Sequence, residues 1–287
     1  MKFGIAFANV GPFVQPENAV HLAKACEARG IESLWTVEHV VVPAGYQAEY
    51  PYSPSGKMPG NEDSPIPDPL IWLSFVAGAT QKIKLATGIL ILPQRHPAYV
   101  AKEVATLDVL SGGRTILGIG IGWLEEEFAA LGLAFEDRVE RTEEACAALR
   151  TLWKPGANAF KGEHFHWDAL ESNPKPVQSG GPPIVVGGHV KGAARRAARV
   201  GDGFFPMKTE GGRLRELLDA MADECAKVGR DPKQIEVTTA LPGHDLDAIK
   251  ALEDQGVSRL VMGPPAFDRD GIEKGLDAFA DGVMAKL

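Results

Sequence analysis

Polar side chains and glycines follow several short apolar runs of this 287-residue chain, at the point where each run ends. Such groups can do chemistry when parallel strands bring their carboxyl ends together, because catalytic residues of α/β barrels gather at that end. The same residue types also cap helices and form turns, so position alone leaves both interpretations open. The groups are Asn9, Glu38, His39, Gln94, Arg95, His96, the segment 120–123, the segment 187–189 and Lys208.

A pair of glycines predicts a site for an anion. Gly187 and Gly188 stand between an apolar run and the helical pattern over 190–200. Exposed backbone amides and the positive end of the helix dipole at such a turn suit a phosphate. Lys191 and Arg195 lie one helical turn apart and would assist. A tight turn followed by a solvated basic face is the alternative.

Other chemistries find less support in the residues. The segment 118–122 is glycine-rich, but Trp123 stands where a dinucleotide fingerprint needs its third glycine, so we interpret these glycines as admitting a flat ligand. His164 and His166 share one strand face without a third ligand, which favours a hairpin surface over a metal site. Lys208 has no neighbouring acid for Schiff-base chemistry. We therefore expect no metal ion.

The elements that position these groups alternate between strands and helices. Most of the β-rich runs are continuously apolar, as in strands buried on both faces of a parallel sheet. Amphipathic stripes between them indicate helices at 19–26, 97–107, 214–221 and 272–283. This alternation favours an α/β fold, a (β/α)8 TIM barrel formed by one domain over residues 1–287, with an open sheet as the alternative. The eight runs are Phe3–Ala8, Ser33–Val37, Ile83–Leu92, Thr115–Ile119, Ile184–Val186, Gly203–Phe205, Ile235–Ala240 and Arg259–Met262.

Glycines and two irregular segments complete the pattern. Gly30, Gly201, Gly229 and Gly256 each follow a helical stretch, where a left-handed C-terminal cap is expected. Residues 40–67 form a long loop after the second strand, which we interpret as a lid because compact domains seldom carry such long loops without a function. The segment 153–183 predicts a small hairpin and an extended stretch, inserted before the fifth strand.

Composition and charge exclude several classes of function. The chain is 45% hydrophobic and 24% charged, as in ordinary globular proteins, and its net charge is -8. Because nucleic acids and anionic membranes require concentrated positive charge, we expect neither partner. No apolar stretch approaches the ~18 residues that span a bilayer. The three cysteines, at 26, 146 and 225, lack disulfide or zinc spacing and indicate reduced thiols in the cytoplasm.

At these residues the chain resembles the bacterial luciferase-like family of flavin and deazaflavin oxidoreductases, and it looks closest to the branch that uses coenzyme F420. The resemblance runs in family order over roughly residues 1–265. The segments that carry it are 35–39 (WTVEH), 87–97 (TGILILPQRHP), 107–114 (LDVLSGGR), 118–128 (GIGIGWLEEEF), 182–188 (PPIVVGG) and 201–203 (GDG).

What the resemblance implies is a barrel with the isoalloxazine-like ring at the strand ends. Behind the ring it implies a non-proline cis peptide, here between Gly88 and Ile89, and beside the ring an acidic residue and a histidine, here Glu38 and His39. Glu38 and His39 are therefore expected to be catalytic. The expected cofactor-binding residues are Gly88, Ile89, Gly122, Trp123, Val186, Gly187, Gly188 and His189, the last four at the phosphate.

A hydride-transfer mechanism follows from this resemblance. A deazaflavin exchanges a hydride at C5, so the protein must align donor and acceptor and exclude water. Histidine titrates near neutral pH, which makes His39 the candidate proton donor or acceptor. Tyr46, Tyr50 and Tyr52 of the lid would shape a pocket for a small-molecule substrate. We expect a homodimer. The alternatives are an FMN-dependent monooxygenase, a non-catalytic flavin-binding protein and a metal-dependent barrel hydrolase.

Overall fold

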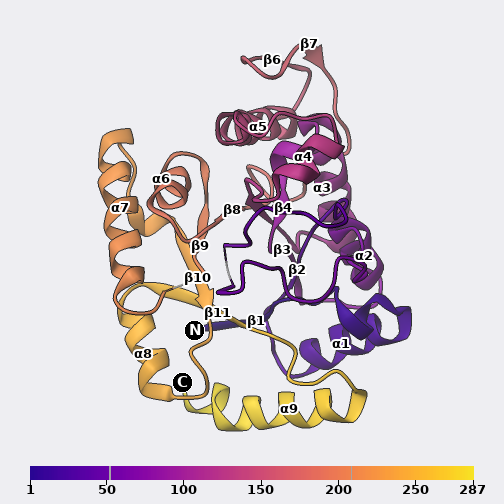
Figure 1. Ribbon diagram of the computed structural model, residues 1–287, viewed down its shortest axis with the longest axis vertical. Coiled ribbons are helices and arrows are strands. Elements are labelled where there is room, and N and C mark those ends of the chain that lie inside the picture. The colour runs from indigo at the N-terminus through magenta and orange to yellow at the C-terminus, as the bar shows by residue number, and fades with distance from the viewer. Residues whose placement is uncertain (52, 208) are drawn as a thin grey trace.

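Parallel strands form a closed barrel in this computed structural model, which describes residues 1–51, 53–207 and 209–287 (Figure 1). The sheet order is β3-β2-β1-β11-β10-β9-β8-β5, and the pairing of β3 with β5 closes it. The predicted (β/α)8 barrel is therefore confirmed. The strands are β1 (Lys2–Ile5), β2 (Ser33–Thr36), β3 (Lys84–Thr87), β5 (Thr115–Gly120), β8 (Ile184–Gly187), β9 (Gly203–Phe205), β10 (Glu236–Ala240) and β11 (Val257–Met262).

The third strand is interrupted. A two-residue strand, β4 (Leu90–Ile91), pairs with β5 farther along than β3 does. Gly88 and Ile89 lie between the two pieces, and the peptide bond that joins them is cis, as the resemblance implied. The predicted run Ile83–Leu92 is thus one barrel strand with a break at its carboxyl end.

Helices surround the barrel and cover its outer face (Figure 1). They coincide with the amphipathic stripes because each stripe must be buried against the strands. The helices are α1 (Pro16–Ala28), α2 (Pro69–Ala77), α3 (Pro97–Ser111), α4 (Glu125–Ala130), α5 (Arg138–Trp153), α6 (Lys191–Val200), α7 (Arg213–Val228), α8 (Leu246–Asp254) and α9 (Arg269–Gly282). Short 3-10 turns occupy Gly11–Val14, Leu92–Gln94, Pro232–Gln234 and Met284–Lys286.

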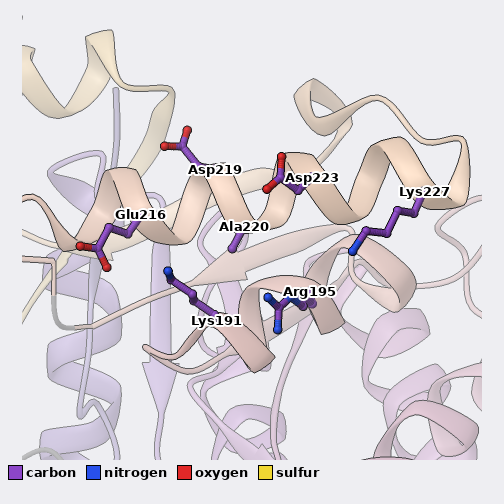
Figure 2. A pocket seen from close by; sticks show the side chains of 7 residues that line it. All are labelled: Lys191, Arg195, Glu216, Asp219, Ala220, Asp223 and Lys227. Carbon is purple, nitrogen blue, oxygen red and sulfur yellow. The ribbon is translucent and has the colours of Figure 1, made fainter.

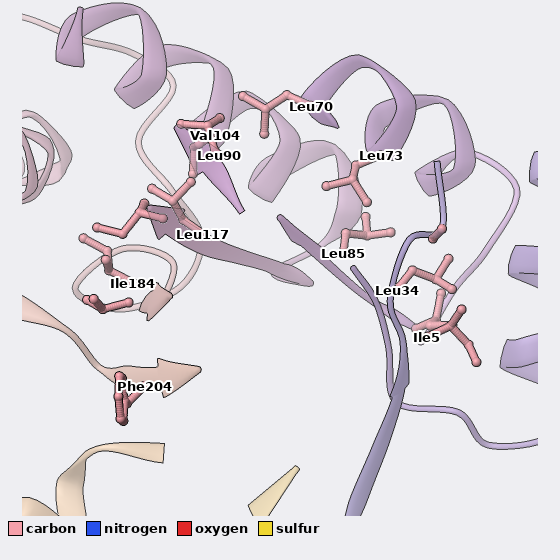
Figure 3. Close-up of a cluster of buried hydrophobic side chains, with 14 of the residues drawn as sticks. Ile5, Leu34, Leu70, Leu73, Leu85, Leu90, Val104, Leu117, Ile184 and Phe204 are labelled. Carbon is pink, nitrogen blue, oxygen red and sulfur yellow. The ribbon is translucent and has the colours of Figure 1, made fainter. Parts of the chain in front are cut away.

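In most strands, neighbouring residues enter two separate apolar clusters. The larger cluster fills the layer between strands and helices; Figure 3 shows Leu34, Leu85 and Leu117 of the strands meeting side chains of α2 and α3. The smaller cluster fills the inside of the barrel around Trp35, which is fully buried. Its members are Ala6, Trp35, Ala86, Ile116, Val185, Phe205 and Val261. The barrel is therefore a packed core and not a pore.

Both irregular segments lie where they were predicted. β6 (Asn158–Lys161) and β7 (His166–Leu170) pair as an antiparallel hairpin that stands away from the barrel, and residues 171–183 contain no helix or strand (Figure 1). The described residues of 40–67, which we call the lid, form turns and bends only. Tyr52, expected to belong to the pocket, lies outside the described residues.

Three of the four expected glycine caps are confirmed. Gly30, Gly229 and Gly256 have φ values of 75°, 69° and 95°. The prediction for Gly201 is wrong, because its backbone is extended at φ -91° and ψ 150°. Glycine is needed there for space: an added Cβ would lie 2.9–3.0 Å from two carbonyl oxygens and from a methyl group of Val186.

Candidate active site

The residues predicted to line the mouth of the barrel do lie at the carboxyl ends of the strands, but several are already occupied by protein partners. Asn9, fully buried, joins three segments. Its side-chain amide donates to the carbonyls of Val37 (2.9 Å) and Pro67 (3.1 Å), and its oxygen accepts from the amide of Val37 (2.9 Å). Asn9 therefore fastens the ends of β1 and β2 to the end of the lid.

His39 forms a hydrogen bond with a carboxylate that lies far away in sequence. Its Nδ1 is 2.9 Å from Oε2 of Glu127, and the two side chains are only 9% and 1% exposed. The indole of Trp123 packs edge-on against the imidazole, with ring centroids 5.7 Å apart. His39 is thus held at the mouth by Glu127 of α4 and by Trp123, which lies two residues before that helix begins.

Glu38 faces away from this pair and binds Arg95. Its Oε1 accepts from Nε of Arg95 at 3.0 Å and also from NH2, while its Oε2 accepts from the amide of Ile91. Arg95 in turn reaches Asp68 at 2.6 Å. Burial disfavours the charged guanidinium, but these two carboxylates outweigh it and raise the pKa of Arg95 above its ordinary value. The structure therefore does not bring Glu38 and His39 together as an interacting pair.

The interrupted third strand projects a side chain across the mouth. Ile89 fills the space above two glycines: a Cβ built at Gly120 would lie 2.5 Å from its Cδ1, and one at Gly187 would lie 2.7 Å from its Cγ2. At Gly122, whose φ is 78°, the ring of Phe128 would lie 2.6 Å away. Protein side chains therefore occupy the space where a side chain would stand at Gly120, Gly122 and Gly187, which explains why these positions are glycines. That a flat ligand lies against this backbone stays a prediction.

Trp123 is the centre of an aromatic cluster that joins the site to the lid. The rings of Tyr46 and Tyr50 pack edge-on against it, with centroid distances of 5.5 and 5.1 Å. Two glutamates of α4 hold the same loop by its backbone: Oε1 of Glu126 accepts from Gln47 (2.7 Å), and Oε1 of Glu127 accepts from the amide of the residue after His39 (2.7 Å). The lid is therefore anchored on α4 beside the imidazole.

The turn after β8 fits a phosphate. Gly188 has a φ of 132°, and its amide already donates to the carbonyl of Phe205 (3.2 Å). Among the described residues, no side chain caps the first turn of α6, and a Cβ at Gly192 would meet none of their heavy atoms within 4 Å. The guanidinium of Arg213 lies at this turn, 3.1–3.2 Å from the carbonyl of His189. Uncapped amides beside an arginine are the donor set that a phosphate prefers.

Lys191 and Arg195 share their surroundings with acids. They lie on one side of a groove of about 250 Å³ between α6 and α7, and Figure 2 shows the carboxylates of Glu216, Asp219 and Asp223 along α7. These acids offset the positive charge that was expected to help hold an anion. Arg213 was not predicted, because nothing in its sequence context distinguishes it from the other basic residues of its helix.

Two further groups at the mouth remain available to a ligand. Both side-chain amide atoms of Gln94 are buried without a hydrogen-bond partner among the described residues, which suits the polar edge of a bound ring. Phe7, directly after β1, has a φ of 57° and is 39% exposed. A bulky residue with positive φ is uncommon and often marks a functional position. No sequence signal predicted it.

The described residues form neither a cluster of metal ligands nor a membrane-spanning helix. Over residues 1–51, 53–207 and 209–287, no three His, Cys, Asp or Glu side chains come together as a metal site. Within the same ranges, no helix is long and apolar enough to cross a membrane. Lys208, considered above as a Schiff-base residue, lies outside the described residues.

Relatives of the chain carry names from both cofactor classes. It is 30% identical to the F420-dependent glucose-6-phosphate dehydrogenase of Kineococcus radiotolerans over 246 residues, 83% of this chain and 67% of that protein. It is also 30% identical to the FMNH2-dependent dimethylsulfone monooxygenase of Pseudomonas fluorescens, over 75% of this chain and 54% of that protein. An uncharacterized protein of Mycobacterium tuberculosis is 30% identical over 93% of this chain and 95% of its own.

Solved structures share the fold at low identity. An F420-dependent secondary alcohol dehydrogenase superposes with a TM-score of 0.79 at 19% identity, covering 99% of this chain and 98% of that one. The monooxygenase RslO1 of Streptomyces bottropensis superposes with a TM-score of 0.77 at 22% identity, covering 100% and 99%. The family model described as luciferase-like monooxygenase matches residues 1–258, and the chain belongs to this family of flavin- or deazaflavin-dependent oxidoreductases.

Proposed function

We propose that this protein is an F420-dependent oxidoreductase that transfers a hydride between the deazaflavin and a small organic substrate. The observation that carries the proposal is the buried imidazole of His39, held at the mouth of the barrel between Glu127 and Trp123. The relative named as F420-dependent, aligned over 83% of this chain, supports the choice of cofactor. The bound deazaflavin supplies the hydride chemistry at its C5.

The residues of the chain have separate tasks in this proposal. Nε2 of His39 gives or takes the proton that accompanies hydride transfer. Trp123, Tyr46 and Tyr50 exclude water from the reacting atoms. Because the carboxylate of Glu38 is fully engaged by Arg95 and a backbone amide, we assign Glu38 to holding the mouth and not to proton transfer.

The phosphate of the cofactor is proposed to bind at the turn after β8. The residues of this turn are Val186, Gly187, Gly188 and His189, and the donors are the first amides of α6 together with Arg213. The ring is proposed to lie against Gly88, Ile89, Gly122 and Trp123. The polar amide of Gln94 is added to that set because it has no protein partner among the described residues.

Cofactor titration tests the proposal directly. F420 and FMN are each titrated into the purified protein and followed by fluorescence quenching, and the absorbance of the bound cofactor identifies it at ~420 or ~450 nm. We expect F420 to bind more tightly. FMN binding tenfold tighter than F420 would favour the FMN-dependent monooxygenase, whose support is the Pseudomonas fluorescens relative. Binding of neither cofactor overturns both assignments.

Two further properties are proposed, the oligomeric state and the cellular location. A homodimer is supported by apolar side chains exposed on α2 and α3, two helices that pack against each other; the most exposed of these side chains include Ile71 (73%), Phe75 (51%) and Leu110 (73%). Sedimentation of the purified chain tests this, since a monomer at micromolar concentration contradicts it. A cytoplasmic location is proposed because Cys26, Cys146 and Cys225 are all free, whereas proteins of oxidising compartments commonly carry disulfides.

A further inference from the structure

The carboxylate of Glu127 is fully buried, and its hydrogen bonds go to the segment that begins at His39. Its Oε2 lies 2.9 Å from the imidazole Nδ1, and its Oε1 lies 2.7 Å from the amide of Val40 and 3.3 Å from that of Val41. An ionised carboxylate only accepts hydrogen bonds, so the proton of this contact belongs to Nδ1 of the imidazole.

Among the described residues, the imidazole is the one ionisable basic partner of this carboxylate, beside the two backbone amides that donate to it. Within residues 1–51, 53–207 and 209–287, the imidazole of His39 is the only basic side chain that lies within ion-pair distance of Glu127. The two backbone amides and the N-terminal turn of α4 offset part of the cost of burying this carboxylate, but they supply no full positive charge. When Nε2 takes up a proton, the resulting imidazolium supplies that charge.

We propose that Glu127 is a positioning residue that holds His39 as the Nδ1–H tautomer and thereby presents Nε2 as the nitrogen that exchanges a proton. This inference rests on the proposed function only for the use of that proton; the tautomer itself is a property of the protein without cofactor or substrate. Among the described residues, no hydrogen-bond partner of Nε2 is found. The geometry corresponds to the carboxylate–histidine unit of hydrolytic triads, where the acid orients the ring and does not itself take the proton.

A purely structural role is the competing explanation, because Glu127 also holds the backbone of the lid. The neighbouring Glu126 provides a matched control. It too accepts hydrogen bonds from backbone amides of the lid, those of Gln47 (2.7 Å) and Ala48 (3.1 Å), but it does not contact an imidazole. Substitution of either glutamate therefore removes a contact to the lid, whereas only substitution of Glu127 should change the tautomer of His39.

The test is nitrogen NMR of protein labelled with 15N-histidine, recorded at pH ~8.5 so that ordinary imidazoles are neutral. A His39→Gln variant identifies the His39 signals among those of the seven histidines. In the wild type we expect the 15N chemical shift of Nδ1 to be that of a protonated imidazole nitrogen. The shift of Nε2 should be that of an unprotonated one. A wild-type Nε2–H tautomer overturns the proposal even if no variant can be purified.

The Glu127→Gln variant gives the second readout. Its amide oxygen still accepts from the lid, but its NH2 group donates toward Nδ1, so the two nitrogen signals of His39 should exchange positions. Glu126→Gln should leave them unchanged. An unchanged His39 tautomer in Glu127→Gln overturns the proposal, and so does an exchanged one in Glu126→Gln.

Turnover separates this inference from the proposed function. Once a substrate is found, Glu127→Gln should lower kcat about 100-fold or more with little change in KM, and adding it to His39→Ala should cost nothing further. Losses that multiply in the double variant overturn the positioning role. If neither F420 nor FMN binds but the tautomer exchanges as expected, the proposed function has failed and the role of Glu127 stands.

Discussion

Arg95 holds the carboxylate of Glu38 with two of its guanidinium nitrogens, and the carboxylate is only 2% exposed. Removing Glu38 takes away the buried carboxylate of this pair and leaves Arg95 with the more exposed carboxylate of Asp68. We expect Glu38→Ala to lower the free energy of unfolding by about 3 kcal/mol in urea titrations. The exposed pair Arg215–Asp219 is the control, and Asp219→Ala should cost well under ~1 kcal/mol. Equal losses in the two variants would contradict the structural role of Glu38.

His39→Ala should leave the fold intact and reduce turnover about 100-fold or more, as loss of a general acid or base does. The side chain lies at the mouth and not in the apolar core, so its removal creates no cavity among core residues. The check is thermal unfolding together with steady-state rates once a substrate is known. Near wild-type turnover in this variant removes His39 from the mechanism.

Arg213→Gln should weaken binding of the phosphate-bearing cofactor about tenfold, because a charge-assisted donor is lost beside the α6 amides. Arg215, on the same helix, pairs with Asp219, so Arg215→Gln should leave affinity unchanged. Lys191→Ala should cost less than Arg213→Gln, since acids of α7 line the same groove. Cofactor titration measures all three. Gly188 is unsuitable for this test, because a Cβ there would lie 2.7 Å from that of Ala193.

Gly120→Ala should destabilise the protein by about 1–3 kcal/mol, the usual cost of overpacking. Its new methyl group would lie 2.5–2.8 Å from two carbons of Ile89, which lines the mouth. Gly282→Ala serves as the control, because a Cβ at that helical position meets nothing within 4 Å. Urea unfolding compares the two. A neutral Gly120→Ala would show that Ile89 moves aside freely.

Acid should detach the lid from α4. The backbone amide of Gln47, with that of Ala48, holds the pKa of Glu126 below its ordinary 4.5. A carboxyl with a depressed folded-state pKa stabilises the folded form above its unfolded pKa and loses this effect as the pH falls through its folded pKa. We therefore expect a fluorescence change of Trp123 below pH ~4.5, identified by comparison with Trp123→Phe. In Glu126→Gln this step should be absent, and its persistence there would assign it to another group.

Local patterns predicted the strands and helices because each requirement is local. A continuous run such as residues 115–119 is suited to burial on both faces, and the strand β5 (Thr115–Gly120) has almost the same bounds as this run. The partners of site residues could not be predicted in this way. Glu127 lies 88 residues from His39 and Arg95 lies 57 from Glu38, so only the closed barrel brings them together. Glu38 and His39 are adjacent in sequence, yet their side chains have different partners.

Glycines show the same limit. A glycine after a helix predicts a left-handed cap correctly at Gly30 and Gly229, where the helix itself creates the need. At Gly120 and Gly201 the reason is a crowding neighbour from a distant part of the chain, which sequence alone does not show.

The filled interior of the barrel has a kinetic consequence. Trp35 blocks the axis, and Arg259, from the amino-terminal half of β11, lies with its guanidinium 5.5 Å from the indole ring. Because nothing can pass through the barrel, both ligands of the proposed reaction must enter and leave by the same opening. In the proposed complex, the deazaflavin ring lies at the strand ends, deeper in this opening than a substrate that enters from the side of the lid. For the proposed reaction we therefore expect a compulsory order of binding, in which the cofactor enters first and leaves last.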